Sequence, residues 1–178
     1  MQFQYETERL LLQVCNEEYA PALLTFMTDN REFFAPYEPH REPAFYTEAF
    51  QAQVLRAEFQ AMLRHTYIRY YLFLKEDPAR IIGTVSFSNI SRTDDKSCRV
   101  GYKLDEHHTG KGYATEALTA FLPVMMERLH LAQVEGICDA RNTASIRVLE
   151  KCGFRHTFAG DALYHGKIQP VVRLTYTR

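Results

Sequence analysis

The chain has 178 residues, 46% of them hydrophobic, and this size and composition fit one globular domain over residues 1–178 with a sizeable core. Its formal net charge of −1 argues against a general DNA-binding or membrane-surface protein, so an anionic ligand must be bound locally. Four cysteines stand far apart without C-x-x-C spacing, which argues against a metal site or a disulfide framework and favours a reducing cytoplasmic location.

The N-terminal half predicts a strand, a helix, an apolar loop and a second helix. No basic segment followed by a long apolar run opens the sequence, so we expect a soluble protein that is not secreted. Residues 8–14 are typical of a strand and residues 16–30 of a helix. The three prolines of residues 31–43 disfavour regular helix, while the aromatic residues there are too apolar for a solvated linker. Residues 45–65 predict a long helix with one apolar face.

The C-terminal half changes to strand periodicity and then alternates between strands and helices. Residues 67–75 and 80–90 are rich in β-branched and aromatic residues and predict a hairpin, and residues 97–104 predict another strand. An early meander followed by alternating elements indicates a mixed α/β sheet. The remaining predicted elements are a helix from Gly110 to about His130, a strand over 132–140, a helix over 142–151 and a hairpin around 165–167.

The stretch "DEHHTGKGYATEAL" (105–118) joins a predicted strand to a predicted helix. Backbone N–H groups at a helix start bind anions, Gly110 and Gly112 let a ligand approach the main chain, and Lys111 adds positive charge. The spacing fits neither the phosphate loop G-x-x-x-x-G-K-[ST] nor the dinucleotide fingerprint G-x-G-x-x-G, whose third glycine is here Thr115. A phosphate ligand and a glycine-rich turn without a ligand both remain open.

Two motifs taken together resemble those of the GNAT N-acetyltransferases. The segment "HHTGKGYATEA" is similar to the family's Q/R-x-x-G-x-G/A at a helix start, and "NTASIRVLEKCGF" (142–154) is similar to its second motif. The resemblance implies that the first motif binds the pyrophosphate of coenzyme A, that the preceding strand pairs with the pantetheine arm, and that the second motif faces the thiol end. The cofactor-binding residues so implied are Tyr102, Lys103, Leu104, His107, Gly110, Lys111, Gly112, Tyr113, Ala114, Asn142 and Ser145.

Across nearly the whole chain the sequence is similar to the RimJ/RimL type of ribosomal-protein acetyltransferases, especially the alanine-specific members. The segments "TERLLLQ", "NREFFAPYEPHRE" and "YHGKIQPVVRLTY" lie in matching order. Three positions depart from the pattern. His107 occupies the hallmark Gln/Arg position, Arg99 stands where many relatives have a glutamate often proposed as general base, and Leu149 stands where other branches have a tyrosine acid. The general base is therefore open.

Acetyl transfer to an amine needs a neutral nucleophile, an oxyanion donor and a proton donor for the departing thiolate. The resemblance implies that Ser145 is the donor to sulfur and that Asn142 orients it. An N-cap and an ordinary first-turn residue explain the same two positions equally well. His107 and His108 are placed nearer the cofactor backbone than the acetyl group, and no third ligand is spaced to form a metal site with them.

The loop over residues 31–43 supplies the acceptor side. Glu38 and Glu42 are the candidates for a base that acts directly or through water. Phe34 and Tyr37, together with these two carboxylates, are candidates for binding the acceptor, although core packing explains the aromatic residues equally well. An α-amine is about 14% neutral at pH 7 and a lysine amine about 0.04%, so a site without a strong base suits the α-amine.

The resemblance implies a GNAT fold of the α/β class, with a central mixed, mostly antiparallel twisted sheet of six to seven strands, about four helices, and strands splayed at the acetyl-CoA site. It implies an acetyl-CoA-dependent N-acetyltransferase in which a primary amine attacks directly, the expected acceptor being the N-terminal α-amine of a ribosomal or other protein. Two alternatives are acetylation of a small-molecule amine and a non-catalytic acyl-CoA-binding or ribosome-assembly module. We expect a monomer or homodimer without DNA or membrane partners.

Overall fold

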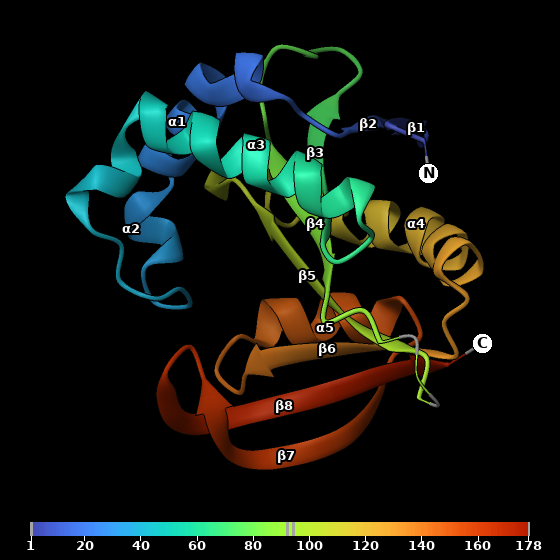
Figure 1. Cartoon of the computed structure of the whole chain (residues 1–178). Helices are drawn as coiled ribbons and strands as arrows, with labels where there is room; N and C mark the ends of the chain where they lie inside the picture. The colour runs from blue at the N-terminus through green and yellow to red at the C-terminus, as the bar shows by residue number, and fades with distance from the viewer. Residues whose placement is uncertain (1, 92, 94, 178) are drawn as a thin grey trace.

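The computed structural model describes residues 2–91, 93 and 95–177, and in this part of the chain eight strands form one twisted sheet (Figure 1). The strand order is β1-β2-β3-β4-β5-β6-β8-β7. The strands are β1 (Gln4–Glu6), β2 (Leu10–Gln13), β3 (Ile68–Leu74), β4 (Gly83–Ser88), β5 (Ser97–Leu104), β6 (Gln133–Asp139), β7 (Arg155–Tyr164) and β8 (Lys167–Thr177).

Neighbouring strands pair antiparallel except β5 and β6, which pair parallel. The expected mixed, mostly antiparallel sheet is thus confirmed, but the expected six to seven strands fall short of the eight observed. The additional strand is β1, which is three residues long and carries the polar side chains of Gln4 and Glu6. So short and polar a segment has no recognisable strand pattern, and its pairing with β2 defines it.

Among the described residues, five α-helices flank the sheet, one more than the sequence predicts. They are α1 (Ala20–Asp29), α2 (Arg31–Phe34), α3 (Glu48–Leu63), α4 (Tyr113–Leu129) and α5 (Thr143–Lys151). The unexpected helix is α2, a single turn inside the proline-containing loop. It is compatible with the prolines because it ends before Pro36, whose ring prevents a helix from continuing through it. None of these described helices is long and apolar enough to cross a membrane.

The helices cover the two faces of the sheet and create two cores (Figure 1). Beneath α4, Phe121 packs edge-to-face on Tyr70 with ring centroids 4.6 Å apart. Between the sheet and helices α1 and α3, Leu55 of α3 and Phe73 of β3 are fully buried. Full burial of such a side chain stabilises the fold by roughly 1.5–3 kcal/mol, so these contacts hold both helical layers on the sheet.

Strands β5 and β6 pair over only part of their length. The pairing runs from Ser97–Gln133 to Val100–Gly136, although β5 continues to Leu104 and β6 to Asp139. Figure 1 shows the two strands diverging beyond the paired end. The expected splay of neighbouring strands is therefore present between β5 and β6. We refer to the unpaired ends of the two strands, residues 101–104 and 137–139, as the β5–β6 gap.

Candidate active site

The candidate anion site lies at the start of α4, close in sequence to the end of β5. Gly110 and Gly112 have left-handed φ angles of 73° and 84°, which are costly for residues with a Cβ atom. The N–H groups from Gly110 to Tyr113 donate to no protein acceptor in the part of the chain that the structure describes. These exposed amides at a helix N-terminus, next to the side chain of Lys111, fit a pyrophosphate.

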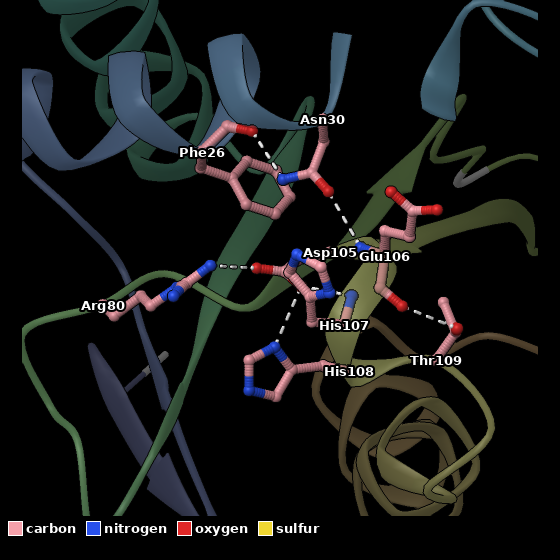
Figure 2. A network of polar contacts seen from close by, with 8 residues as sticks. All are labelled: Phe26, Asn30, Arg80, Asp105, Glu106, His107, His108 and Thr109. Atoms are coloured by element: carbon pink, nitrogen blue, oxygen red, sulfur yellow. Dashed lines mark hydrogen bonds and ion pairs between the residues drawn. The ribbon is translucent and has the colours of Figure 1, made fainter. Parts of the chain in front are cut away.

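A buried carboxylate fixes the turn that precedes this loop (Figure 2). Asp105 is 1% exposed, and its carboxylate accepts hydrogen bonds from Arg80 Nη2 at 2.8 Å and the His107 amide at 2.8 Å and contacts His108 Nδ1 at 3.0 Å. Burial raises the pKa of the Asp105 carboxyl, but the hydrogen bonds from His108, Arg80 and the His107 amide outweigh it and lower the pKa. The ionised carboxylate therefore anchors the turn.

The same turn is joined to the end of α1 through Asn30. This side chain is 3% exposed, donates from Nδ2 to the Phe26 carbonyl at 2.9 Å, and accepts from the Glu106 amide at 2.8 Å (Figure 2). Thr109 Oγ1 in turn donates to the Glu106 carbonyl at 2.8 Å. Helix α1, which precedes the loop over residues 31–43, and the turn that precedes the glycine loop over residues 110–112 therefore share one hydrogen-bond network.

Arg9, at the start of β2, braces the glycine loop from the other side. Its Nη1 donates to the Lys111 carbonyl at 3.1 Å, its Nε pairs with Glu116 Oε2 at 2.7 Å, and its guanidinium lies 4.4 Å from the centre of the Tyr113 ring. Thr7 Oγ1 also donates to Glu116. The Glu116 carboxylate, in the first turn of α4, is thereby neutralised by Arg9 and does not stand unpaired at an anion site.

On the α5 side of the β5–β6 gap, three polar side chains meet at Ser145. The Tyr102 hydroxyl donates to the Ser145 carbonyl at 2.7 Å and lies 2.8 Å from Ser145 Oγ, and Cys138 Sγ lies 3.2 Å from the same Oγ. Asn142 caps α5, because its Oδ1 accepts from the Ser145 amide at 3.0 Å. Burial raises the pKa of the Tyr102 phenol and of the Cys138 thiol, so both groups stay protonated at neutral pH.

A family model for the acetyltransferase (GNAT) domain matches residues 9–155 of the chain. This protein belongs to the GNAT acetyltransferase family. It is 34% identical over 131 residues to the probable N-acetyltransferase YjcK of Bacillus subtilis, a match that covers 74% of this chain and 72% of that one. It is 29% identical over 160 residues to the ribosomal protein uS5-alanine N-acetyltransferase of Escherichia coli, covering 88% and 81%.

Solved structures agree with this assignment. The ribosomal-protein-S5-alanine acetyltransferase of Vibrio fischeri superposes with a TM-score of 0.90 at 25% identity, covering 99% of this chain and 97% of that one. GNAT enzymes of the same fold, 18% and 21% identical to this chain, are known in complex with acetyl-CoA or coenzyme A. The expected GNAT fold is confirmed.

The loop over residues 31–43, predicted to bind the acceptor, is joined to β5 by a partly buried ion pair. Lys103 Nζ is in short contact with Glu38 Oε1, and Arg41 Nη2 lies 3.7 Å from the other Glu38 oxygen. The ammonium group of Lys103 also lies 5.0 Å from the centre of the Phe34 ring, which is buried. Burial lowers the pKa of Lys103, although Glu38 opposes the shift. The pair attaches the acceptor loop to β5.

Other predicted site residues do not join these clusters. Tyr37 is 39% exposed, and Glu42 is exposed and precedes a short turn without a side-chain cap. The exposed His107 contributes its backbone amide to Asp105. Leu149, where some branches of the family have a tyrosine acid, is fully buried against Gly136. Their proposed roles stay predictions.

Several residues of the site escaped the sequence interpretation. The Tyr102 side chain, expected to matter through its backbone, reaches Ser145, and Tyr164 donates to the Ile137 carbonyl at 3.2 Å at the open end of β6. Burial raises the pKa of Tyr164 to about 12. The alternation of side chains along β5 could have predicted that Tyr102 and Lys103 reach different clusters, because it places them on opposite faces of the sheet.

Proposed function

We propose that this GNAT acetyltransferase uses acetyl-CoA to acetylate the N-terminal α-amine of a protein, with residues 1–178 acting as one domain. The names of the relatives suggest ribosomal proteins as the acceptor class. One observation carries the proposal. The unpaired end of β5 carries Tyr102, which reaches the Ser145 cluster on one face, and Lys103, which reaches Glu38 on the other. The amides at the start of α4 that donate to no described acceptor follow β5 in the sequence.

The residues at the gap fit coenzyme A. The free N–H groups of Gly110 to Tyr113 and the charge of Lys111 suit the pyrophosphate. The backbone of residues 102–104, no longer paired with β6, can hydrogen-bond an extended amide-containing arm in the manner of an added strand. Bound there, acetyl-CoA supplies an activated acyl group as a thioester, with its reacting end near Ser145.

Ser145 is proposed to donate a proton to the departing sulfur. Its hydroxyl is held by Tyr102 at 2.8 Å, and the Asn142 cap fixes the backbone of the first turn of α5. Asn142 can thus cap α5 and position Ser145 at the same time. Because the neighbouring Cys138 thiol is buried and its pKa is raised, it is a poor nucleophile. This favours direct attack by the amine over an acetylated enzyme.

Glu38 is the proposed acceptor of the amine's proton, directly or through water. The carboxylate contacts both Lys103 and Arg41, which hold it in position. A carboxylate is a weak base, which suits an acceptor amine that is already partly neutral. An α-amine is about 14% neutral at pH 7, against about 0.04% for a lysine amine, which supports the α-amine as acceptor.

Steady-state acetylation of two matched peptides tests the proposal. One begins with a free alanine amine and contains no lysine, and the other has a blocked N-terminus and one internal lysine. We expect thiol release from acetyl-CoA with the first peptide only, and a loss of that activity in Ser145→Ala but not in Thr143→Ala, an exposed position on the same helix. Equal turnover of the lysine peptide contradicts the α-amine assignment.

A further inference from the structure

The face of β5 that points away from α4 carries positive charge. Side chains alternate along a strand, and Cys98 and Val100 are buried in the core beneath α4. Arg99, Gly101 and Lys103 therefore project from the opposite face, toward the acceptor loop. The contact between Lys103 and Glu38 agrees with this assignment.

The charges on this face do not balance. Among the described residues, Glu58 pairs with Arg69 and Asp139 pairs with Arg141. Glu135, the cross-strand partner of Arg99 on β6, lies 4.0 Å from Arg173. The remaining charged groups are one carboxylate and three cations, namely Glu38, Arg41, Lys103 and Arg99. Lys103 and Arg41 share Glu38, while Arg99 pairs with no carboxylate of the described residues. Its Nε, like those of Arg41, Arg69 and Arg173, is buried without a hydrogen-bond partner, but only Arg99 of these four also lacks an ion pair among the described residues. An anionic ligand that accepts from Arg99 would supply the missing partner.

In the strip between Arg99 and Lys103, β5 itself carries no side chain on this face. Four residues of a strand span about 13 Å, and the residue midway between them is Gly101. On β4, Ser86 and Ser88 pair with Gly101 and Arg99 and so present their side chains on the same face. A Cβ atom on Gly101 would lie 3.2 Å from Ser86 Oγ. The strip therefore offers hydroxyl groups and cations to a ligand.

The turn between β7 and β8 lies near the same charges. Burial lowers the pKa of His165, Glu38 opposes the shift, and Arg41, Lys103 and Arg99 contribute to it. His165 is therefore neutral at pH 7 and leaves the excess of positive charge unchanged. The side chains around the strip thus present two more cations than anions.

We propose that the acceptor carries an anionic group next to the amine that is acetylated, and that Arg99 binds this group. The inference rests on the proposed acetyltransfer to an amine and names the chemistry of its acceptor. A peptide with an acidic residue directly after its N-terminal residue has this chemistry, as does a small amine with a phosphate. Arg99 acts in acceptor binding, while Glu38 and Ser145 keep their proposed roles.

Acceptors that differ by one charge test the inference. The peptides Ala-Asp, Ala-Asn and Ala-Lys share all following residues, and 2-aminoethyl phosphate is compared with ethanolamine. For the wild type we expect kcat/KM for the Ala-Asp peptide to exceed that for Ala-Asn by roughly 10- to 100-fold, mainly through KM. Arg99→Gln should reduce this ratio to about one, and Arg99→Glu should favour Ala-Lys.

Arg56→Gln is the matched control. Arg56 lies on α3 and pairs with the exposed Glu17, so its loss changes the net charge equally and should leave the ratio intact. An anion preference confined to 2-aminoethyl phosphate, and lost in Arg99→Gln, supports the inference with a small molecule as the source. Equal turnover of charged and neutral acceptors by the wild type overturns the inference alone. If acetyl-CoA binds but no amine is acetylated, the proposed function fails and the inference fails with it.

Discussion

The Tyr102 hydroxyl lies 2.7 Å from the Ser145 carbonyl oxygen and 2.8 Å from Ser145 Oγ. Tyr102 belongs to β5 and Ser145 to α5, which follows β6, so one side chain bridges the two halves of the sheet where their strands no longer pair. The role proposed for Ser145 would therefore depend on a contact that crosses the β5–β6 gap.

Tyr102→Phe should lower kcat by roughly tenfold, because Ser145 loses the hydrogen bond that fixes its hydroxyl. Ser145→Ala should lower kcat by at least as much. The double variant should be little worse than Ser145→Ala, because both changes affect one unit. Steady-state kinetics of the three variants provide the measurement. Multiplicative effects would show that the two residues act independently.

Gly110→Ala should weaken acetyl-CoA binding. The added Cβ meets no atom within 4 Å, so the change acts through the φ of 73°, which costs a non-glycine residue about 1–2 kcal/mol and favours a rearranged loop. We expect the KM for acetyl-CoA to rise roughly tenfold. Gly153→Ala imposes similar strain at φ 89° behind α5 and should lower stability without raising this KM. Equal KM values in the two variants would contradict the assignment of the loop.

Glu38→Gln should lower kcat by about 100-fold if this carboxylate accepts the amine's proton. For the wild type, kcat/KM should rise between pH 6 and 8 as an α-amine with a pKa near 7.8 becomes neutral. Glu32→Gln, an exposed change on α2 in the same loop, is the control and should retain activity. Full activity of Glu38→Gln would remove Glu38 from the mechanism.

Asp105→Asn should reduce stability at pH 7 by about 1–3 kcal/mol, because Arg80 and the His107 amide lose a charged acceptor. The folded-state pKa of Asp105 lies below its ordinary value of 3.8. Its contribution to stability is thus present above pH 3.8 and is lost as the pH falls through the folded-state pKa.

Denaturant unfolding of the wild type and Asp105→Asn, from pH 7 down to pH 3, measures this loss. The difference between the two curves should begin to shrink as the pH falls below about 3.8. Asp161→Asn, an exposed change on β7, should follow the wild type at every pH. A constant difference between the wild type and Asp105→Asn over this range would show that the carboxylate is not preferentially stabilised in the folded state.

Much of the fold was predictable because its signals are local. Apolar periodicity identified the helix with Phe121 and Met125, and both side chains are buried. The short β1 and the single-turn α2 were missed because each is defined by its neighbours: β1 by pairing with β2, and α2 by its position directly after α1. Propensity over three or four residues carries too little information for either.

The residues of the candidate site also fall into those that a local motif predicts and those that only the folded chain brings together. Local motifs located Gly110, Gly112, Asn142 and Ser145. By contrast, the contacts of Glu38 with Lys103, of Asp105 with Arg80 and of Arg9 with Glu116 join residues 65, 25 and 107 positions apart. Such pairs depend on how the sheet is assembled, and no spacing rule within one segment predicts them. The role proposed for Arg99 likewise follows only once the charged residues on its face of β5 are known.

The partial pairing of β5 with β6 also bears on how the enzyme responds to its ligand. Beyond Val100 and Gly136 the two strands lack the reciprocal backbone hydrogen bonds that close the sheet elsewhere. A cofactor that pairs with this edge completes the sheet, so local opening of residues 101–104 and 137–139 should become rarer on binding. Amide hydrogen exchange should slow first in these segments. Acetyl-CoA would then be a structural component of the sheet for as long as it stays bound.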